Sequence, residues 1–252
     1  MLLLLSPAKT MNFTDKIPMV GNNSEPVFLK QAIFLNKILL QMDSSNLKNA
    51  LQLSDKQLLP VIDSIKMFCS DNIKRQAIYA YRGAVYKAID SLSLNGNQIK
   101  FAQNHIRILS GLYGILKPLD LIQQYRLDMK SKIKIPNTTN LYQYWKNIIS
   151  DYILKDNPYK TLVNLSSREF SKMVDFTIQK VRIIDISFSE INNNILTSPP
   201  MYSKIARGKM TGFIIRNFLT VPEEIKKYNL DGYSFNNYLS SDNSYIFTRE
   251  HH

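Results

Sequence analysis

The stretch ILSGLYGILKPLDLIQQYRLDM, from Ile108 to Met129, decides how the rest of the chain is arranged. Two apolar pairs flank a short turn that contains Gly111 and Gly114. Two glycines so close together indicate that the backbone passes near another chain segment or near a ligand. Pro118 then fixes a rigid corner, because its ring locks φ and favours an extended residue before it. The stretch is therefore either a tight turn between two core segments or a turn beside a binding site.

Strand and helix patterns are interspersed along the chain around this stretch. The four leucines from Leu2 to Leu5 predict a buried central strand, apolar runs at 161–165 and 181–188 predict two more, and alternation at 130–135 predicts an edge strand. Helices are predicted at 24–42, 54–65, 74–89 with a break at Gly83, 98–108, 136–159 and 202–219, and a terminal hairpin at 232–248. This order predicts a mixed α/β (α+β) fold with a central mixed sheet and helices around it.

Composition narrows the class of protein. The 252 residues are enough for one large domain or two small ones, and their apolar content of 44% is ordinary for a globular protein. The apolar run at residues 1–5 is too short for a membrane span and lacks the features of a signal peptide, so we expect a cytoplasmic protein without membrane contact. One cysteine excludes an intrachain disulfide and a cysteine-built metal cluster. Residues 251–252, both histidine, are interpreted as a tag remnant.

The net charge of +12 is unevenly distributed along the chain. Three windows contain lysine and arginine but no acidic residue: 91–119, 129–150 and 191–222. Such windows predict positive patches that can hold a polyanion by releasing its counterions, or a merely solvated basic surface. We find no phosphate-binding loop, no dinucleotide-binding fingerprint and no metal-binding motif in the sequence, so no metal site and no cofactor are expected.

Three local patterns offer polar groups for chemistry. Ser6 and Lys9 follow the first strand, at the end where open α/β sheets usually place ligands. Arg82 lies midway between two tyrosines seven residues apart, so a helix there would gather all three on one face. In the helix at 202–219, two glycines stand between Lys204 and Arg216 at intervals of four. This bare ridge admits another helix or a phosphate backbone, and each helical glycine costs ~1 kcal/mol relative to alanine.

Several blocks in fixed order resemble the peroxide stress protein YaaA family. They are Leu5-Ser6-Pro7-Ala8-Lys9-Thr10, Ala77 to Gly83 with Val85-Tyr86, the turn at 108–118, Asn140 to Trp145, Asn164 to Ser167, and Ala206 to Met210. Order and spacing agree from Met1 to about Arg249, which implies a single domain over residues 1–250. The resemblance implies an elongated α/β domain with a positively charged cleft.

The same resemblance implies a function. The family is associated with survival of hydrogen peroxide, by keeping unincorporated iron low and so limiting oxidative damage to DNA, and with binding of double-stranded DNA through a helix-hairpin-helix element. Such an element usually turns on Gly-apolar-Gly, whereas this chain has one residue more between Gly111 and Gly114. With one cysteine and one internal histidine, we expect any effect on iron to be indirect.

The first functional hypothesis is a DNA-binding stress protein. Its phosphate contacts would come from cations and its stacking surfaces from tyrosines. The predicted cations are Lys9, Arg82, Arg107, Lys117, Arg126, Lys204, Arg207, Lys209 and Arg216, and the predicted tyrosines are Tyr81, Tyr86 and Tyr113.

The second hypothesis is an enzyme acting on a nucleobase or nucleotide. The Ser-x-x-Lys after the first strand and the Ser110–Tyr113 turn are similar to elements of proteins that modify nucleobases. By this analogy the candidate catalytic residues are Ser6, Lys9, Ser110, Tyr113 and Arg126, with Lys9 as the amine nucleophile or charge stabiliser. A scaffold for an acidic protein partner, a small-molecule ligand in the cleft and the oligomeric state all stay open.

Overall fold

The four leucines Leu2–Leu5 form β1, a central strand of the main sheet that lies between β8 and β5. All four are at most 1% exposed, because a central strand is covered on both faces. The computed structural model describes residues 1–18, 21–70, 73–177, 180–193 and 195–250, so residues 251–252 lie outside the described residues. Both ends of the chain contribute strands to this sheet, and its apolar side chains belong to one hydrophobic core.

The sheet is mixed, with the order β11-β12-β9-β8-β1-β5-β6 and β10 paired to β9. Its five middle strands run parallel, and β6, β10 and β11 pair antiparallel to them. This confirms the predicted mixed α/β fold. The strands other than β1 are β5 (Ile106–Ser110), β6 (Gly114–Leu116), β8 (Thr161–Asn164), β9 (Arg182–Asn192), β10 (Ile195–Thr197), β11 (Ser234–Phe235) and β12 (Ser244–Glu250).

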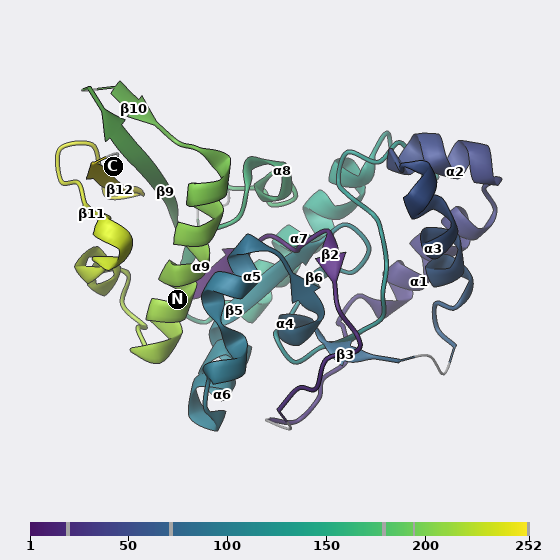
Figure 1. Cartoon of the computed structure of the whole chain (residues 1–252), viewed down its shortest axis with the longest axis horizontal. Coiled ribbons are helices and arrows are strands. Elements are labelled where there is room, and N and C mark those ends of the chain that lie inside the picture. Colours follow the sequence, from purple (N-terminus) through teal and green to yellow (C-terminus); the bar gives the residue numbers. More distant parts are fainter. Residues whose placement is uncertain (19–20, 71–72, 178–179, 194, 251–252) are drawn as a thin grey trace.

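Helices cover both faces of the sheet, and the molecule is longest from the helices α1–α3 to the strands β9–β12 (Figure 1). Figure 1 shows α5, α6 and α9 in front of the sheet and α7 behind it. The longer helices are α1 (Leu29–Leu40), α2 (Ser44–Leu51), α3 (Asp55–Lys66), α5 (Ala84–Ile89), α6 (Gly96–His105), α7 (Leu141–Asp156) and α9 (Pro200–Arg216). Short elements connect them: α4 (Ala77–Ala80), α8 (Arg168–Ser171), η1 (Ser91–Ser93), η2 (Pro222–Lys227), η3 (Leu230–Gly232), and the strand pairs β2 (Thr10–Met11) with β4 (Tyr81–Arg82) and β3 (Arg75–Gln76) with β7 (Leu121–Ile122).

The turn between β5 and β6 is packed inside the protein. A Cβ built at Gly111 would lie 2.1 Å from the Leu127 carbonyl oxygen. Gly114 has a φ of +69°, and a Cβ there would lie 2.5 Å from the Trp145 ring. The Trp145 indole N–H also donates to the Gly111 carbonyl at 2.9 Å. The close approach that the two glycines predicted is therefore an approach of the chain to itself, so the turn joins two core segments.

The two glycines in the ridge of α9 serve helix packing. A Cβ at Gly208 would lie 2.2 Å from the Val85 carbonyl oxygen of α5, and one at Gly212 would lie 3.2 Å from the Ile89 carbonyl oxygen. The ridge is bare because α5 lies against it. Of the two alternatives that the sequence left open there, the neighbouring helix is the one observed.

Several predicted elements are wrong in part, among them the helix predicted at 136–159, which begins at Leu141 and ends at Asp156. Residues 130–135 form no strand, although Ile133 and Ile135 are buried and the alternating lysines at 130, 132 and 134 are exposed, so the alternation reflects burial alone. The predicted helix at 74–89 is divided into β3, α4, β4 and α5, because Arg75–Gln76 and Tyr81–Arg82 pair with other segments. The helix predicted at 98–108 ends at His105, where β5 begins. α1 begins at Leu29 rather than after Ser24, whose hydroxyl donates to Asp120 instead.

Other local predictions are confirmed. Ser54 and Gln57 form the predicted capping box of α3. β11 and β12 form the predicted antiparallel terminal pair. α9 extends over nearly the predicted range.

Candidate functional site

A pocket of ≈ 320 Å³ lies at the carboxyl ends of β1 and β8, which are neighbours in the sheet. Segments far apart in the sequence line it, as expected for the ligand-binding edge of an open α/β sheet. Its lining residues are Ser6, Pro7, Ala8, Lys9, Thr10, Arg82, Gly83, Ala84, Val85, Tyr86, Leu165, Ser167, Glu169, Phe170, Lys204 and Arg207. We call this the strand-end pocket.

Two serines join the walls of the pocket. Ser6 follows β1 and Ser167 follows β8, and the Ser167 backbone N–H donates to the Ser6 Oγ at 2.8 Å. The Ser6 hydroxyl donates in turn to the Ser167 Oγ at 3.2 Å. From α5, the Tyr86 hydroxyl donates to the Ser6 carbonyl at 2.9 Å. These bonds fix the loop after β1 against both neighbouring segments.

Arg207 of α9 is the most unusual charge in the pocket. It is partly buried, and its Nε is fully buried without a hydrogen-bond partner. Burial lowers the pKa of the Arg207 guanidinium, and no carboxylate of the described residues lies within ion-pair distance to oppose this. Lys204, one helical turn earlier and exposed, likewise makes no ion pair with a described residue. A half-buried cation without a partner is costly unless a ligand supplies the opposite charge.

The other cations of the pocket carry acidic partners. Lys9 lies 3.0 Å from Asp128, and Arg126 shares the same carboxylate at 3.3 Å. These three residues line a small hollow of ≈ 30 Å³ that adjoins the strand-end pocket through residues 7–9 and Phe170. Arg82 pairs with Asp15 at 2.7 Å. The Lys9 side chain is 64% exposed, so the dry environment that favours a nucleophilic amine is absent around it.

None of the three predicted tyrosines offers an open ring face, although Tyr86 is among the residues that line the pocket. Tyr81 and Tyr113 are at most 1% exposed, and Tyr86 is 4% exposed. The Tyr125 hydroxyl lies 2.7 Å from both the Tyr81 hydroxyl and the Ser110 Oγ, and burial raises the pKa of Tyr125 to about 12. These phenols therefore stay protonated and work as hydrogen-bonding groups inside the protein, so the structure does not present Tyr81, Tyr86 and Tyr113 as stacking surfaces.

The Ser110–Tyr113 turn does not line the pocket that contains Lys9. Ser110 is fully buried, and its Oγ accepts from the Tyr113 N–H at 3.0 Å. The Tyr113 hydroxyl accepts from the Gln123 N–H at 3.0 Å, on the side of a different cavity. The enzyme hypothesis named Lys9, Ser110 and Tyr113 together, and the structure does not bring these residues into one pocket.

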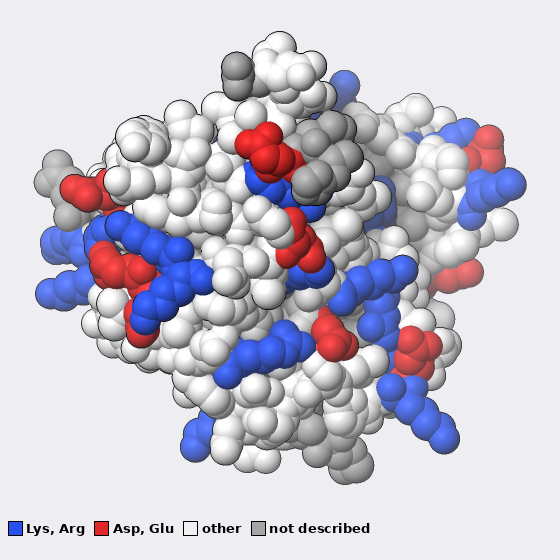
Figure 2. Space-filling view, turned by 60° about the vertical axis from the view of Figure 1, so that its left-hand side comes forward, with Lys and Arg blue, Asp and Glu red and all other residues white. Residues whose placement is uncertain are grey.

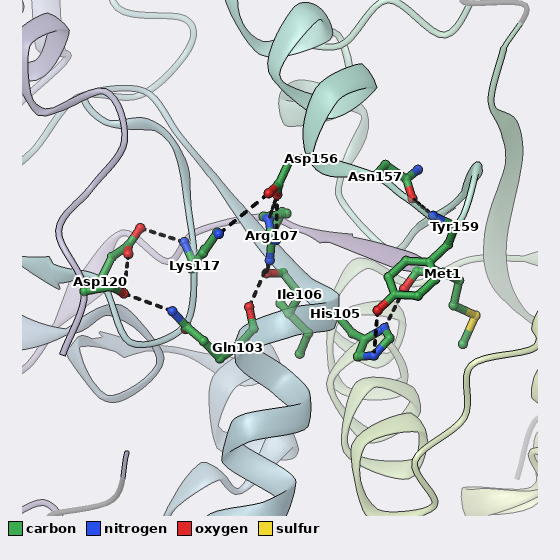
Figure 3. Close-up of polar contacts among 11 residues, drawn as sticks. Met1, Gln103, His105, Ile106, Arg107, Lys117, Asp120, Asp156, Asn157 and Tyr159 are labelled. Carbon is green, nitrogen blue, oxygen red and sulfur yellow. Dashed lines mark hydrogen bonds and ion pairs between the residues drawn. The ribbon is translucent and has the colours of Figure 1, made fainter. Parts of the chain in front are cut away.

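Four of the predicted cations lie away from the pocket and are neutralised there. Arg107 and Lys117 both meet Asp156 at the end of α7, and Arg107 is 3% exposed (Figure 3). Lys209 pairs with Asp231, and Arg216 contacts Asp90 and the carbonyl of Ile89 at the end of α5. On the face shown in Figure 2, basic side chains are likewise interspersed with acidic ones. Of the nine predicted cations, Lys9, Arg82, Lys204 and Arg207 line the pocket and Arg126 adjoins it.

The sequence interpretation missed Ser167, Glu169 and Phe170, which also line the pocket. For Ser167, the sequence contained a signal. Ser166-Ser167 comes shortly after the buried strand β8, as Ser6 comes directly after β1, and β8 is the parallel neighbour of β1. Without knowing that the two strands pair, the sequence gives no reason to place the two serines together.

With this geometry in view, comparison with known proteins identifies the family. The family model described as peroxide stress protein YaaA matches residues 1–239. The chain belongs to the peroxide stress protein YaaA family. The resemblance seen in the sequence blocks is thereby confirmed, and membership supports a role in the peroxide stress response.

Curated relatives in this family cover the whole chain. The chain is similar to proteins called UPF0246 protein from Hahella chejuensis (36% identical, 100% of both chains), Colwellia psychrerythraea (38%, 99% of both) and Neisseria gonorrhoeae (35%, 99% of this chain and 98% of the relative). Within the described residues, no helix combines the length and apolar character needed to span a membrane. The same residues contain no group of three or more His, Cys, Asp or Glu side chains placed to hold a metal ion.

Proposed function

We propose that this protein acts in the peroxide stress response by binding double-stranded DNA in the cytoplasm, with the strand-end pocket and its rim as the contact surface. The observation that supports this most is the convergence of Lys9, Arg82, Lys204 and Arg207 from three distant segments. Two of these cations have no carboxylate partner among the described residues, so they are available to phosphates. Arg126 adjoins them and shares Asp128 with Lys9.

The size of the strand-end pocket favours contact of the duplex with the pocket rim over insertion of the duplex into the pocket. A pocket of ≈ 320 Å³ is at the lower end of the range for small-molecule sites and cannot admit a double helix. A duplex would lie across the pocket mouth and present phosphates to the exposed Lys9 and Lys204. Affinity would then depend on charge far more than on base sequence.

Limitation of iron-dependent damage is the second part of the proposal. We infer an indirect route, in which a protein bound along DNA shields it from oxidants formed nearby. Iron binding to the protein is not required for this. Measuring whether purified protein protects plasmid DNA from iron and peroxide, with and without DNA-binding variants, tests this part.

A salt series tests the DNA proposal. Each phosphate that a protein cation neutralises contributes about 0.9 to the slope of log affinity against log salt concentration. We expect Lys204→Gln to reduce this slope by about 1. The matched control is Lys117→Gln, which removes the same charge at a site occupied by Asp156 and is expected to leave the slope unchanged. An affinity for duplex DNA that does not vary with salt would refute the proposal.

One observation keeps an enzyme in consideration. The strand-end pocket has the volume of a small-molecule site, and its lining contains the carboxylate of Glu169 and the hydroxyls of Ser6 and Ser167. An enzyme acting on a nucleobase or nucleotide would use this pocket, without the buried Ser110–Tyr113 turn. DNA binding that survives Lys9→Ala while peroxide protection is lost would favour catalysis, whereas equal effects of all pocket cations on protection and binding would favour binding alone.

A further inference from the structure

The guanidinium of Arg207 differs from those of the other arginines that the structure describes. Each of the others is either exposed, as Arg168 is, or bonded to a carboxylate or carbonyl within the protein. The bonded ones are Arg75 and Arg82 on Asp15, Arg107 on Asp156, Arg126 on Asp128, Arg182 on Glu223, Arg216 on Asp90 and Arg249 on Glu190. Arg207 alone in this set is partly buried without such a partner, and it lines a cavity. An anionic ligand in the cavity would complete its hydrogen bonds.

The paired serines leave one donor free for the same ligand. The Ser6 Oγ accepts the Ser167 N–H, and its own proton goes to the Ser167 Oγ. A hydroxyl has one proton to donate, so only that of Ser167 is still unassigned among the two serines. Ser167, Lys204 and Arg207 thus offer donors from two walls of one pocket.

The pocket also has an apolar lining. Pro7, Val85, Leu165 and Phe170 line it together with the donors. Its volume of ≈ 320 Å³ suits a single nucleotide unit, in which a flat ring can rest on apolar side chains while the phosphate meets the cations. Glu169 adds an acceptor for an N–H or O–H of the same nucleotide.

We propose that the strand-end pocket binds a phosphomonoester carried by a nucleoside, with the phosphate held by Arg207, Lys204 and Ser167. This inference deepens the proposed function, because it assigns a ligand class to the site that we propose for DNA. Two kinds of molecule carry such a phosphomonoester. One is a DNA strand with a terminal phosphate, as left where a strand is broken, and the other is a free mononucleotide.

The charges favour a monoester over the diester inside a strand. A phosphomonoester carries a charge of about −1.5 to −2 at pH 7, because its second pKa is about 6. With a single ester bond it also has three free oxygens. Lys204 and Arg207, the two cations without partners, can face the phosphate while Glu169 faces the nucleoside, and the donor groups of Arg207, Lys204 and Ser167 match the three oxygens. A diester carries one charge and has only two free oxygens, so it offers these three donor groups fewer and weaker contacts.

A second groove gives the remainder of a strand a path. A cavity of ≈ 450 Å³ between α5 and α9 shares Gly83 and Ala84 with the strand-end pocket. Lys87 and Met201 line this groove. A strand whose terminal phosphate enters the pocket can therefore continue along the groove between the two helices.

The test is a binding series on the full chain by isothermal calorimetry and thermal shift. The probes are the four deoxynucleoside 5′-monophosphates, the corresponding nucleosides, and the methyl esters of the monophosphates. We expect monophosphates to bind at least about 10-fold more tightly than the nucleosides and the methyl esters. Arg207→Gln should weaken monophosphate binding by about 10- to 100-fold, and Arg168→Gln, the matched removal of an exposed arginine, should leave it within about 2-fold.

The pH profile gives a second readout. Affinity for the monophosphates should rise from pH 5 to pH 7.5 as the phosphate loses its second proton, while affinity for the methyl esters should not. The charged residues that line the pocket are Lys9, Arg82, Glu169, Lys204 and Arg207, and no histidine is among its lining residues. Should Arg207→Gln fold poorly, Ser167→Ala takes its place and should weaken the monophosphate while sparing the nucleoside.

The outcomes separate this inference from the DNA proposal. Monophosphates that bind no better than nucleosides, or that bind equally to wild type and Arg207→Gln, overturn the inference. A covalently closed duplex without ends tests DNA binding independently. If it binds with a steep salt dependence while monophosphates do not bind, DNA binding stands and the inference fails; the reverse result retains the pocket ligand and removes duplex binding. To distinguish the two sources, a 5′-phosphorylated duplex is compared with its 5′-hydroxyl form: tighter binding assigns strand ends, and equal binding assigns free mononucleotides.

Discussion

Arg107 is buried and Arg207 is partly buried, and the surroundings of the two guanidinium groups differ. Arg107 is 3% exposed, and its guanidinium donates to Asp156 and to the carbonyls of Gln103 and Ile106 (Figure 3). Arg207 is partly buried, its Nε has no partner, and the space before it is a cavity. The first site is complete within the protein, whereas the second is completed only when an anion enters. The two sites show that burial of a cation does not by itself indicate a binding site. What distinguishes them is whether groups of the protein already bond to the cation.

The largest effect that tests this comparison is expected at Arg107. Removing Arg107 leaves the Gln103 and Ile106 carbonyls without this donor and leaves Asp156 only its longer contact with Lys117, which costs about 3–5 kcal/mol at most. We expect Arg107→Gln to lower the free energy of unfolding by that amount and the melting temperature by roughly 10 °C. Thermal and urea denaturation measure both. Arg182→Gln, which breaks the more exposed pair with Glu223, should cost less than about 1 kcal/mol. Equal losses in the two variants would contradict the assignment of Arg107 as a structural residue.

The next effect concerns the helix that holds Arg207 in place. Gly208→Ala would force a methyl group against the Val85 carbonyl at 2.2 Å, so α5 and α9 must separate, at a cost of about 1–3 kcal/mol. At Gly212 the nearest atom is the flexible end of Arg216, and the backbone of α5 is 3.2 Å away. The helix-propensity gain of about 1 kcal/mol offsets that milder contact, so Gly212→Ala should be nearly neutral. Denaturation of the two variants in parallel gives the difference; similar stabilities would mean that the two helices can shift freely.

Substitution of Arg207 is expected to change the free energy of unfolding less than substitution of Arg107 does, and in the opposite direction. Without ligand, replacing a desolvated cation that lacks partners removes an unfavourable contribution, so Arg207→Gln should leave stability unchanged or raise it by up to about 1 kcal/mol. The melting temperature would then rise by about 2–4 °C at most. Differential scanning calorimetry of the ligand-free proteins measures this. A marked loss of stability would show that Arg207 has structural partners and that the contrast with Arg107 is false.

The smallest expected effect is the pH dependence of stability that comes from His105, close to Arg107. His105 lies between the rings of Phe101 and Tyr159, and burial lowers the pKa of its imidazole, with the charge of Arg107 acting in the same direction. A lowered pKa means that the unfolded chain binds a proton first as the pH falls below about 6.5. The contribution to stability is therefore complete above that pH and is lost progressively below it. Urea denaturation from pH 7.5 to 5 should show a steeper loss for the wild type than for His105→Gln, and parallel profiles would contradict the shift.

Much of the architecture could be predicted from local patterns. Four consecutive leucines predict a strand covered on both faces, and β1 is such a strand. Glycines at 111 and 114 predict close approach of the backbone, and the structure has it at both positions. The predictions failed where pairing with distant residues overrode local preference. Tyr81–Arg82 sits in a helical pattern but forms β4, because Thr10–Met11 is available as its partner.

The site was predictable only in part, for the same reason. Ser6, Lys9, Arg82, Lys204 and Arg207 were identified from charge and position, and the fold brings them to one pocket. Arg107 and Arg216 have the same chemistry and acid-free surroundings in the sequence, but distant acids neutralise them. No local pattern distinguishes the two groups.

The sequence by itself determined the excess of positive charge, its acid-free windows, the buried central strand and the family to which the chain belongs. Only the tertiary structure decided which cations keep their charge available, because ion pairs form between residues that are distant along the chain. Asp156 and Asp90 approach cations that have no acid near them in sequence, and no described acid approaches Arg207. The parallel pairing of β1 with β8 decided the rest, since it sets Ser6 beside Ser167 and opens the pocket at their shared end.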